Sequence, residues 1–315
     1  MDFVSPVRRG VKSDASAVAQ RVADQLLHDA RLEPLVSPDL PRADFESSLA
    51  ASQSPFWVDD ANGHLRGHLY GATFADPLHG RQTWTGPDGF SFDNEDVLDD
   101  LLRWAHSEWR DDGSLAHLVW ALAGHGTQPW VERGYRVASV RGSRVLDEVE
   151  EPTWPAGQRL RLGTPADLEA ALDFDAMIDE AQGLDPAALP DAQRAAGVAD
   201  VSELLEDPDT RYFILEVDGR PGAQCVTYRL PSLRGNFEDT IYLGSLAVRP
   251  ELRRRGLAGL LVAAALADAR REGFGHAEVR WHIDNHAATA LWSALGFQPT
   301  YVQLRTSLSL LRVVN

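Results

Sequence analysis

The feature that most constrains the fold is a weak internal repeat, in which the two halves of the chain follow the same order of predicted elements. Residues 44–57 align with residues 200–213, and each segment predicts a short helix followed by a strand. Strand pairs separated by Asp, Asn and Gly turns come next in both halves. A repeat of this length indicates two copies of one supersecondary plan. We therefore predict two related domains.

Later segments of the two halves also correspond. Val97–Arg110 and Gly259–Arg271 carry apolar residues at helical spacing. The segment WVERGY, which begins at Trp130, matches WSALGF, which begins at Trp292, with the same internal spacing. Each half thus predicts a strand, two helices, a strand meander, a long helix, a strand, a helix and a strand. Helices alternating with a mixed sheet are typical of an α/β or α+β domain.

An acidic segment with two prolines, DEVEEPTWPAGQ, separates the two halves. We interpret residues 147–158 as a linker between a domain at 1–146 and a domain at 159–315. The total of 315 residues also favours two domains over one. Because a tandem pair can satisfy within one chain what single domains achieve by dimerising, we expect a monomer rather than a homodimer.

Composition excludes several classes of partner. The net charge is −17, with 47 acidic and 30 basic residues, which argues against binding to nucleic acid or an anionic membrane. No apolar run approaches the roughly 20 residues of a membrane span. The start of the chain lacks the apolar segment of a signal peptide, and the single cysteine, Cys225, cannot form an internal disulfide. We expect a cytoplasmic protein.

The sharpest local signal is a loop rich in arginine and glycine between a predicted strand and a predicted helix. The sequence LAVRPELRRRGLAG runs from Leu246 to Gly259, after a strand predicted at Ile241–Val248. A helix start offers unpaired N–H groups and partial positive charge to a phosphate, and glycines allow close approach of the backbone. The spacing fits neither a P-loop nor the dinucleotide-binding fingerprint. The loop predicts a pyrophosphate site.

These residues resemble the GNAT N-acetyltransferase family, whose members bind acetyl-CoA. Arg253-x-x-Gly256-x-Ala258 is similar to the family signature R/Q-x-x-G-x-G/A, and NHAATALWSALGF, which begins at Asn285, is similar to N-x-x-A-x-x-L-Y-x-x-x-G-F. The resemblance covers residues 158–310 well and, through the repeat, residues 5–145 loosely. The two-domain layout resembles that of mycothiol synthases.

The resemblance implies two GNAT-like domains, each a mixed, mostly antiparallel sheet flanked by helices. In the C-terminal copy the fourth and fifth strands are expected to splay, with the pantetheine arm of acetyl-CoA between them. No metal is implied. The cofactor-binding residues implied by the resemblance are Leu246, Ala247, Val248, Arg253, Arg254, Arg255, Gly256, Leu257, Ala258, Gly259, Asn285, Ala288 and Trp292.

The activity implied is direct transfer of an acetyl group from acetyl-CoA to a primary amine of a small molecule. Two alternatives remain open: an acyl-CoA-binding sensor or interaction protein whose catalysis has decayed, and a protein N-terminal acetyltransferase. Cys225 lies on an earlier strand without an evident activating base, which argues against a covalent acyl-enzyme.

The sequence departs from the family pattern at the general acid. Trp292 stands where the family has a tyrosine, and an indole N–H is not a usable acid near neutral pH. Tyr242 and Tyr301 are substitutes elsewhere in the sequence.

The general base is equally open. Candidates are Glu238 and Asp239 before the predicted fourth strand, and Glu278 and His282 on the fifth. Arg280, at the usual position, cannot serve. We rank His282 first because the ordinary pKa of histidine is closest to neutral. The catalytic candidates are therefore His282, Glu238 and Tyr242.

The N-terminal half lacks the loop. Residues 85–95, TGPDGFSFDNE, are acidic where the arginine-rich segment would fall, so this half is not expected to bind CoA in the usual way. Its tryptophans are interpreted as core residues.

The acceptor region is expected near the first helices of the second half. Asp173, Asp175, Asp179 and Glu180 form either a site for a cationic amine or a solvated acidic helix face.

Overall fold

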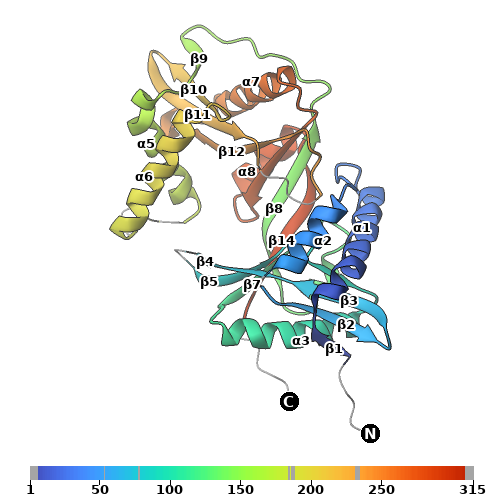
Figure 1. Ribbon diagram of the computed structural model, residues 1–315. Helices are drawn as coiled ribbons and strands as arrows, with labels where there is room; N and C mark the ends of the chain where they lie inside the picture. The colour runs from blue at the N-terminus through green and yellow to red at the C-terminus, as the bar shows by residue number, and fades with distance from the viewer. Residues whose placement is uncertain are drawn as a thin grey trace. The chain divides into compact units, whose positions relative to one another are not determined.

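The computed structural model describes residues 6–52, 54–76, 79–183, 185, 189–230 and 235–308. These residues form two compact units (Figure 1). Unit 1 is made of the described residues of Met1–Val140, Leu233–Phe237 and Thr300–Asn315, and unit 2 of those of Arg141–Ser232 and Glu238–Pro299. Within the described residues, no helix has the length and apolar character needed to cross a membrane.

The element order confirms the predicted repeat. The first half contains β1 (Val7–Arg9), α1 (Ala15–Leu32), α2 (Arg42–Ala51), β2 (Phe56–Ala61), β3 (His64–Tyr70), β4 (Ala72–Asp76), β5 (Gly80–Thr85), β6 (Phe90–Phe92), α3 (Glu95–Asp111), β7 (Ala116–Leu122), α4 (Gln128–Val131) and β8 (Arg136–Val145). The second half contains β9 (Gln158–Leu162), α5 (Leu168–Ala181), α6 (Asp191–Glu206), β10 (Arg211–Val217), β11 (Arg220–Tyr228), β12 (Thr240–Val248), α7 (Leu257–Arg271), β13 (His276–His282), α8 (His286–Ala294) and β14 (Gln298–Ser307).

Each unit takes a strand from the other half of the sequence. In unit 1, β14 pairs antiparallel with β7, from Tyr301 opposite Leu122 to Ser307 opposite Ala116. In unit 2, the end of β8 lies against β13, and the amide of Leu146 donates a hydrogen bond to the carbonyl of Gly275 at 2.8 Å. Strand pairing, which composition does not reveal, therefore assigns the part of β8 from Arg141 onward to unit 2.

The sheet of unit 2 has the strand order β8-β13-β12-β11-β10-β9. β12 and β13 pair in parallel only from Thr240 opposite His276 to Leu243 opposite Val279, whereas β12 continues beside β11 as far as Val248. The register shifts at Gly244, where an added Cβ would lie 2.3 Å from the ring of Tyr228. This bulge bends β12 away from β13. The predicted splay is confirmed.

Helices cover both faces of this sheet. α5 and α6 bury a cluster with β10 and β11 on one face, which includes Ala171, Leu205, Ile214 and Val226. The nearly all-apolar α7 packs against β11 and β12 on the opposite face (Figure 1). Because successive strand residues point to opposite faces, the two helix layers contact alternate side chains of the same strands.

Unit 1 has two separate sheets, β1-β2-β3-β6 and β4-β5-β7-β14. β5 pairs in parallel with β7, as β12 does with β13. A turn at Gly86–Gly89 then ends β5, and β6 pairs with β3 in the other sheet. The strand that corresponds to β12 is therefore broken in two. Within the described residues, unit 1 has no continuous strand that could form one wall of a comparable splay.

Candidate active site

The loop between β12 and α7 has an unusual backbone. Arg254 has φ 64° and Gly256, the N-cap of α7, has φ 78°. A non-glycine residue in the left-handed region costs roughly 1–2 kcal/mol, and among the described residues only Asn62 and Asp218 share this feature with Arg254. Left-handed residues within such a turn direct successive N–H groups to one side and form a concave anion-binding surface. The backbone of this loop therefore has the geometry of an anion-binding surface.

The start of α7 adds further unpaired donors. The first hydrogen bond that closes a helical turn runs from the amide of Leu260 to the carbonyl of Gly256, and no side chain caps Gly256. The amides of the first three helical residues, Leu257, Ala258 and Gly259, precede that bond. An added Cβ at Gly256 would have no neighbour within 4 Å, so its positive φ explains the glycine and packing does not. This helix start suits an anion.

Three consecutive exposed arginines surround this helix start. Arg253 Nε donates to the carbonyl of Val248 at 3.1 Å, and Arg255 Nη2 donates to the carbonyl of Glu251 at 3.3 Å. These contacts hold the two guanidinium groups close to the loop. Together with Arg254 they supply the positive charge that a pyrophosphate group requires.

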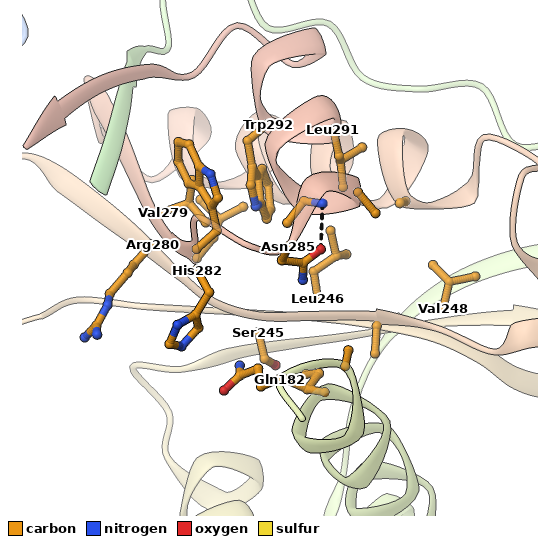
Figure 2. A pocket seen from close by; sticks show the side chains of 18 of the residues that line it. Gln182, Ser245, Leu246, Val248, Val279, Arg280, His282, Asn285, Leu291 and Trp292 are labelled. Carbon is orange, nitrogen blue, oxygen red and sulfur yellow. Dashed lines mark hydrogen bonds between the residues drawn. The ribbon is translucent and has the colours of Figure 1, made fainter. Parts of the chain in front are cut away.

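A cleft of about 590 Å³ opens where β12 and β13 separate (Figure 2). Its walls come from β12 and β13, the end of α5 and the start of α8. The predicted cofactor-binding residues that line it are Leu246, Ala247, Val248, Arg253, Ala258, Asn285, Ala288 and Trp292. The remaining predicted residues, Arg254, Arg255, Gly256, Leu257 and Gly259, form the adjoining loop and helix start rather than the cleft wall.

The backbone of β12 presents alternate peptide groups to this cleft. The amide of Arg249 donates to the carbonyl of Gly222 on β11 at 2.9 Å. In an antiparallel pair the direction of the peptide groups alternates, so those of Val248 and Leu246 point away from β11 and towards the cleft. The peptide groups of Ala247 point towards β11 instead. In this respect Ala247 differs from Leu246 and Val248, although all three are predicted cofactor-binding residues.

The start of α8 forms another part of the cleft. Asn285 Oδ1 accepts a hydrogen bond from the amide of Ala288 at 3.0 Å and caps the helix (Figure 2). Trp292 is 5% exposed and packs edge-to-face on Phe297, with ring centroids 5.4 Å apart. The indole is therefore a fixed wall of the cleft at the position of the family's tyrosine.

Two of the three catalytic candidates lie at the cleft. His282 and Tyr242 both line it. Burial, followed by the influence of Tyr228, raises the pKa of Tyr242 well above its ordinary value, so the phenol stays protonated near neutral pH. Glu238 is exposed outside the cleft, and Asp239 is engaged 2.8 Å from His276 Nδ1.

Other residues considered from the sequence are buried elsewhere. Glu278 is 1% exposed and forms an ion pair with Arg141. Tyr301 belongs to unit 1, where it packs in a buried cluster with Trp120. Cys225 is fully buried, and burial raises the pKa of its thiol to about 12. These positions do not support acid, base or nucleophilic catalysis in the cleft.

The end of α5, within the region where the acceptor is expected, also lines the cleft, but with residues other than those singled out from the sequence. Met177, Ile178 and Ala181 share one helix face there, and Gln182 follows at the end of the helix. Their helical spacing was a readable signal, but the neighbouring acidic residues were considered instead.

Those acidic residues do not line the cleft. Asp173 lies 3.3 Å from Arg249. Burial is the main cause that raises the pKa of Asp175 and Asp179, and the charge of Asp200 on α6 adds to the effect at Asp175. The contacts and electrostatic partners of Asp173 and Asp175 thus lie away from the cleft.

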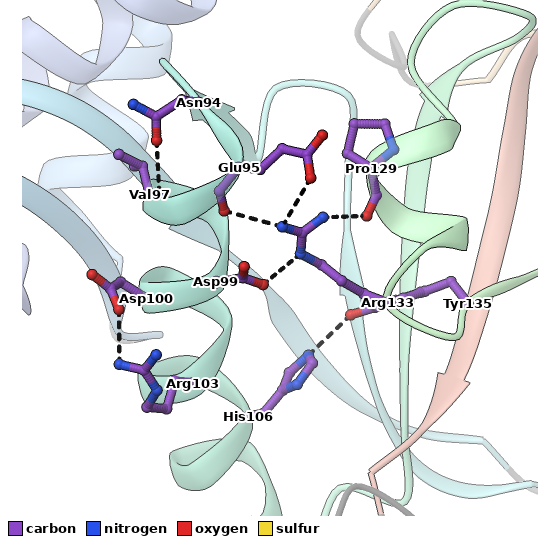
Figure 3. A network of polar contacts seen from close by, with 10 residues as sticks. All are labelled: Asn94, Glu95, Val97, Asp99, Asp100, Arg103, His106, Pro129, Arg133 and Tyr135. Atoms are coloured by element: carbon purple, nitrogen blue, oxygen red, sulfur yellow. Dashed lines mark hydrogen bonds and ion pairs between the residues drawn. The ribbon is translucent and has the colours of Figure 1, made fainter. Parts of the chain in front are cut away.

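Unit 1 differs at each corresponding position. α3 begins with a side-chain cap, because Asn94 Oδ1 accepts from the amide of Val97, and Glu95 lies in its first turn. Arg133 donates to Asp99 at 2.6 Å and to the carbonyl of Glu95 at 3.1 Å (Figure 3). This helix start is capped and acidic, and its nearby arginine is engaged, which is unfavourable for a phosphate.

Aromatic side chains fill the interior of unit 1. The ring of Trp130 lies edge-to-face on Phe90 and Tyr135, at 5.0 and 5.2 Å between centroids. The Tyr135 hydroxyl lies 2.9 Å from His106 Nε2 and 2.6 Å from His117 Nδ1. The interpretation of the tryptophans as core residues holds for Trp109, Trp120 and Trp130, but Trp104 is 48% exposed.

Comparisons with known proteins agree with this geometry. A model of the acetyltransferase (GNAT) family matches residues 174–297. A curated relative from Bacillus subtilis (strain 168), named a putative [ribosomal protein bS18]-alanine N-acetyltransferase, is 26% identical over 97 residues, which is 31% of this chain. The match spans 60% of the length of that relative.

Two solved structures are similar over almost the whole chain. A GCN5-related N-acetyltransferase from Sphaerobacter thermophilus has a TM-score of 0.64 and 18% identity, and the match covers 96% of this chain and 95% of that one. A tandem GNAT protein from the clavulanic acid biosynthesis pathway has a TM-score of 0.58 and 18% identity, over 96% and 98% of the two chains. The segment at residues 174–297 thus matches the GNAT acetyltransferase family.

Proposed function

We propose that unit 2 binds acetyl-CoA and transfers its acetyl group to a primary amine of a small molecule. The observation that carries this proposal is the loop with left-handed Arg254 and Gly256, which leads into α7 beside the splayed strands β12 and β13. It combines an anion site with an adjoining cleft, as a molecule with a pyrophosphate beside a long pantetheine arm requires.

Each part of the donor has a matching surface. The loop and the first amides of α7 would hold the pyrophosphate, with Arg254 as the central charge. The peptide groups of Leu246 and Val248 would bind the pantetheine amides, as a strand edge binds an added chain. Arg253 Nε already donates to the Val248 carbonyl, so bound pantetheine would share or replace that contact.

The chemistry requires one bond to form and one to break. The amine nitrogen attacks the thioester carbonyl, a C–N bond forms, and the C–S bond breaks to release CoA thiolate. The amine must lose a proton, and His282 lies at the cleft where it can accept one, directly or through water. Trp292 cannot supply a proton to the thiolate. Burial makes the Tyr242 phenol a weaker acid than usual, so solvent is the main proton donor to the thiolate and Tyr242 is the alternative.

Unit 1 would play a structural part in this scheme. Its capped, acidic α3 start and its filled aromatic interior support a domain that does not hold CoA in the usual way. We propose the arrangement as a degenerate copy at residues 1–146, a linker at 147–158 and the acetyltransferase copy at 159–315, with the strand exchange described above. A monomer remains the proposed state.

A second candidate function rests on Trp292. A buried indole in place of the family's phenol is compatible with a protein that binds acyl-CoA as a sensor and does not turn it over. The anion loop serves both functions equally, so turnover decides between them. Protein N-terminal amines belong among the acceptors to be tested because the name of the Bacillus subtilis relative gives an alanine of a ribosomal protein as its substrate.

The experiment is a measurement of CoA thiol release from acetyl-CoA against a panel of amines. The panel includes amino acids, polyamines, aminoglycosides, cysteinyl sugars and N-terminal peptides, and Arg254→Glu/Gly256→Asp is the control variant. We expect turnover with one class of amine and its loss in the variant. If acetyl-CoA raises the Tm of the wild type only, and no amine gives turnover, the sensor function replaces the enzyme.

A further inference from the structure

The side chains that line the cleft carry an unexpected charge. The chain has 47 Asp and Glu residues, yet no described carboxylate lines the cleft. The charged or titratable side chains there are Arg253, at the donor loop, and Arg280, His282 and Tyr242. In a protein with a net charge of −17, the surface that would meet the acceptor is therefore locally cationic.

Arg280 lies on the acceptor side of the splayed strands. It follows Val279, the last residue of β13 that pairs with β12. Strand alternation places Arg280 and His282 on one face, and Val279 and Trp281 on the other, where both are buried. Figure 2 shows Arg280 and His282 extending towards the side on which Gln182 of α5 lies, away from Trp292 of α8.

The surroundings of Arg280 are suited to a carboxylate. The Arg280 side chain is accessible at the cleft, and the surrounding protein lowers the pKa of its guanidinium by desolvation, which the nearby phenol of Tyr242 opposes. An arginine always remains charged in a protein, and its planar fork forms paired hydrogen bonds with a carboxylate. In a partly desolvated cleft such a charge-assisted contact is stronger than it is in water.

We propose that the acceptor is an anionic amine, in which a carboxylate accompanies the reacting amino group, and that Arg280 selects it by binding that carboxylate. The inference rests on the proposed acetyltransferase function and names its substrate class. The acidic residues of α5 had suggested a cationic acceptor, but they do not line the cleft. The acceptor proposed here therefore has the opposite charge. His282, two residues along the same face, then stands where it can take the proton of the amine.

Matched amine pairs test this inference in the full-length protein. Each pair keeps the amine and changes the anion: an amino acid and its amide, or β-alanine and propylamine. Phosphoethanolamine and ethanolamine form a third pair, which separates recognition of a carboxylate from recognition of any anion. We expect KM at least about tenfold lower for the carboxylate member, with a smaller change in kcat, because the contact is made equally in ground and transition states.

The variant Arg280→Gln keeps hydrogen-bond donors and removes the charge. We expect it to raise KM for the carboxylate amines and leave the neutral amines little changed. Arg280→Lys should retain part of the preference because the charge remains without the planar fork. Arg220→Gln, an exposed arginine on β11 outside the cleft, is the matched control and should behave as the wild type.

The outcomes separate this inference from the function on which it rests. The inference is overturned if the protein acetylates neutral or cationic amines as well as the carboxylate member of each pair, and if Arg280→Gln does so equally. The proposed acetyltransferase function would then still stand. An equal preference for the phosphate amine assigns the site to anions in general and overturns the choice of carboxylate. Absence of turnover with every amine, while acetyl-CoA still raises the Tm, overturns the function and the inference together. The wild-type comparison stands even where a variant does not fold.

Discussion

Arg141 Nε lies 2.6 Å from Glu278 Oε2, and the two side chains are only 4% and 1% exposed. Arg141 comes from β8, in the first half of the sequence, and Glu278 from β13, in the second, yet both belong to unit 2. The ion pair thus joins the two halves of the chain within the unit that carries the candidate active site. It also explains why Glu278 is unsuited to act as a general base.

Removal of one partner should destabilise unit 2 strongly. Arg141→Ala leaves a buried carboxylate without its counter-charge, and we expect a loss of about 3–5 kcal/mol in the free energy of unfolding. Arg141→Met/Glu278→Leu, which removes both charges, should recover most of that loss. Urea denaturation measures both variants. A loss below about 1 kcal/mol in Arg141→Ala would show that the pair does not hold β8 against β13.

The strand exchange makes a prediction about truncated chains. A chain of residues 136–299 contains β8, whereas a chain of residues 147–299 begins at the predicted linker and lacks Arg141 and Gly142. We expect the shorter chain to lose cooperative unfolding because β13 is left with an unpaired edge and a buried Glu278. Circular dichroism during thermal unfolding compares the two. Equal transitions would place the domain boundary at residue 146 after all.

Much of this fold could be predicted from the sequence because it depends on local patterns. The repeat, the long helices and the splay after Leu243 follow from periodicity, glycine spacing and the resemblance carried by the loop. The exchange of β8 and β14 could not be predicted, because composition does not show which distant segments pair as strands. The burial of Glu278 could not be predicted either, because it depends on which neighbour covers the side chain.

Gly256 offers a matched pair of substitutions for the loop. Gly256 and Gly219 have nearly the same φ, 78° and 77°, and an added Cβ at either would have no neighbour within 4 Å. Alanine at each position should therefore cost a similar amount of stability, about 1–2 kcal/mol, through the left-handed backbone alone. Only Gly256→Ala should weaken acetyl-CoA binding, by about tenfold, which corresponds to about 1.4 kcal/mol.

Thermal unfolding and a calorimetric titration with acetyl-CoA measure the two effects separately. If Gly219→Ala weakens acetyl-CoA binding as much as Gly256→Ala does, the loop conformation has no specific part in holding the donor.

Buried histidines should make unit 1 sensitive to acid. Burial lowers the pKa of His68 to about 4 and that of His106 to about 3, and the pKa of His117 is also well below its ordinary value. The unfolded chain therefore binds more protons than the folded one below pH 6.5, so stability falls as the pH falls. The loss should reach about 2 kcal/mol per histidine at pH 5.

Hydrogen exchange of the amides of β7 at pH values between 7 and 5, corrected for intrinsic exchange rates, measures this loss in unit 1. His68→Gln should make the dependence on pH shallower. Carboxylates with a lowered pKa, such as Asp14 and Asp167, lose their contribution to folding stability only at lower pH. They therefore do not affect the measurement between pH 7 and pH 5. A stability that is constant or rises between pH 7 and pH 5 would contradict the prediction.

The most direct test of the account is the stoichiometry of acetyl-CoA binding, measured by titration calorimetry on the full-length protein. The account predicts one acetyl-CoA per chain, because among the residues that the structure describes only those of unit 2 combine the left-handed loop with a splayed pair of strands. It also predicts loss of binding in Arg254→Glu/Gly256→Asp. Binding of two molecules per chain, or binding that survives in this variant, would contradict the assignment of the donor site to the loop before α7.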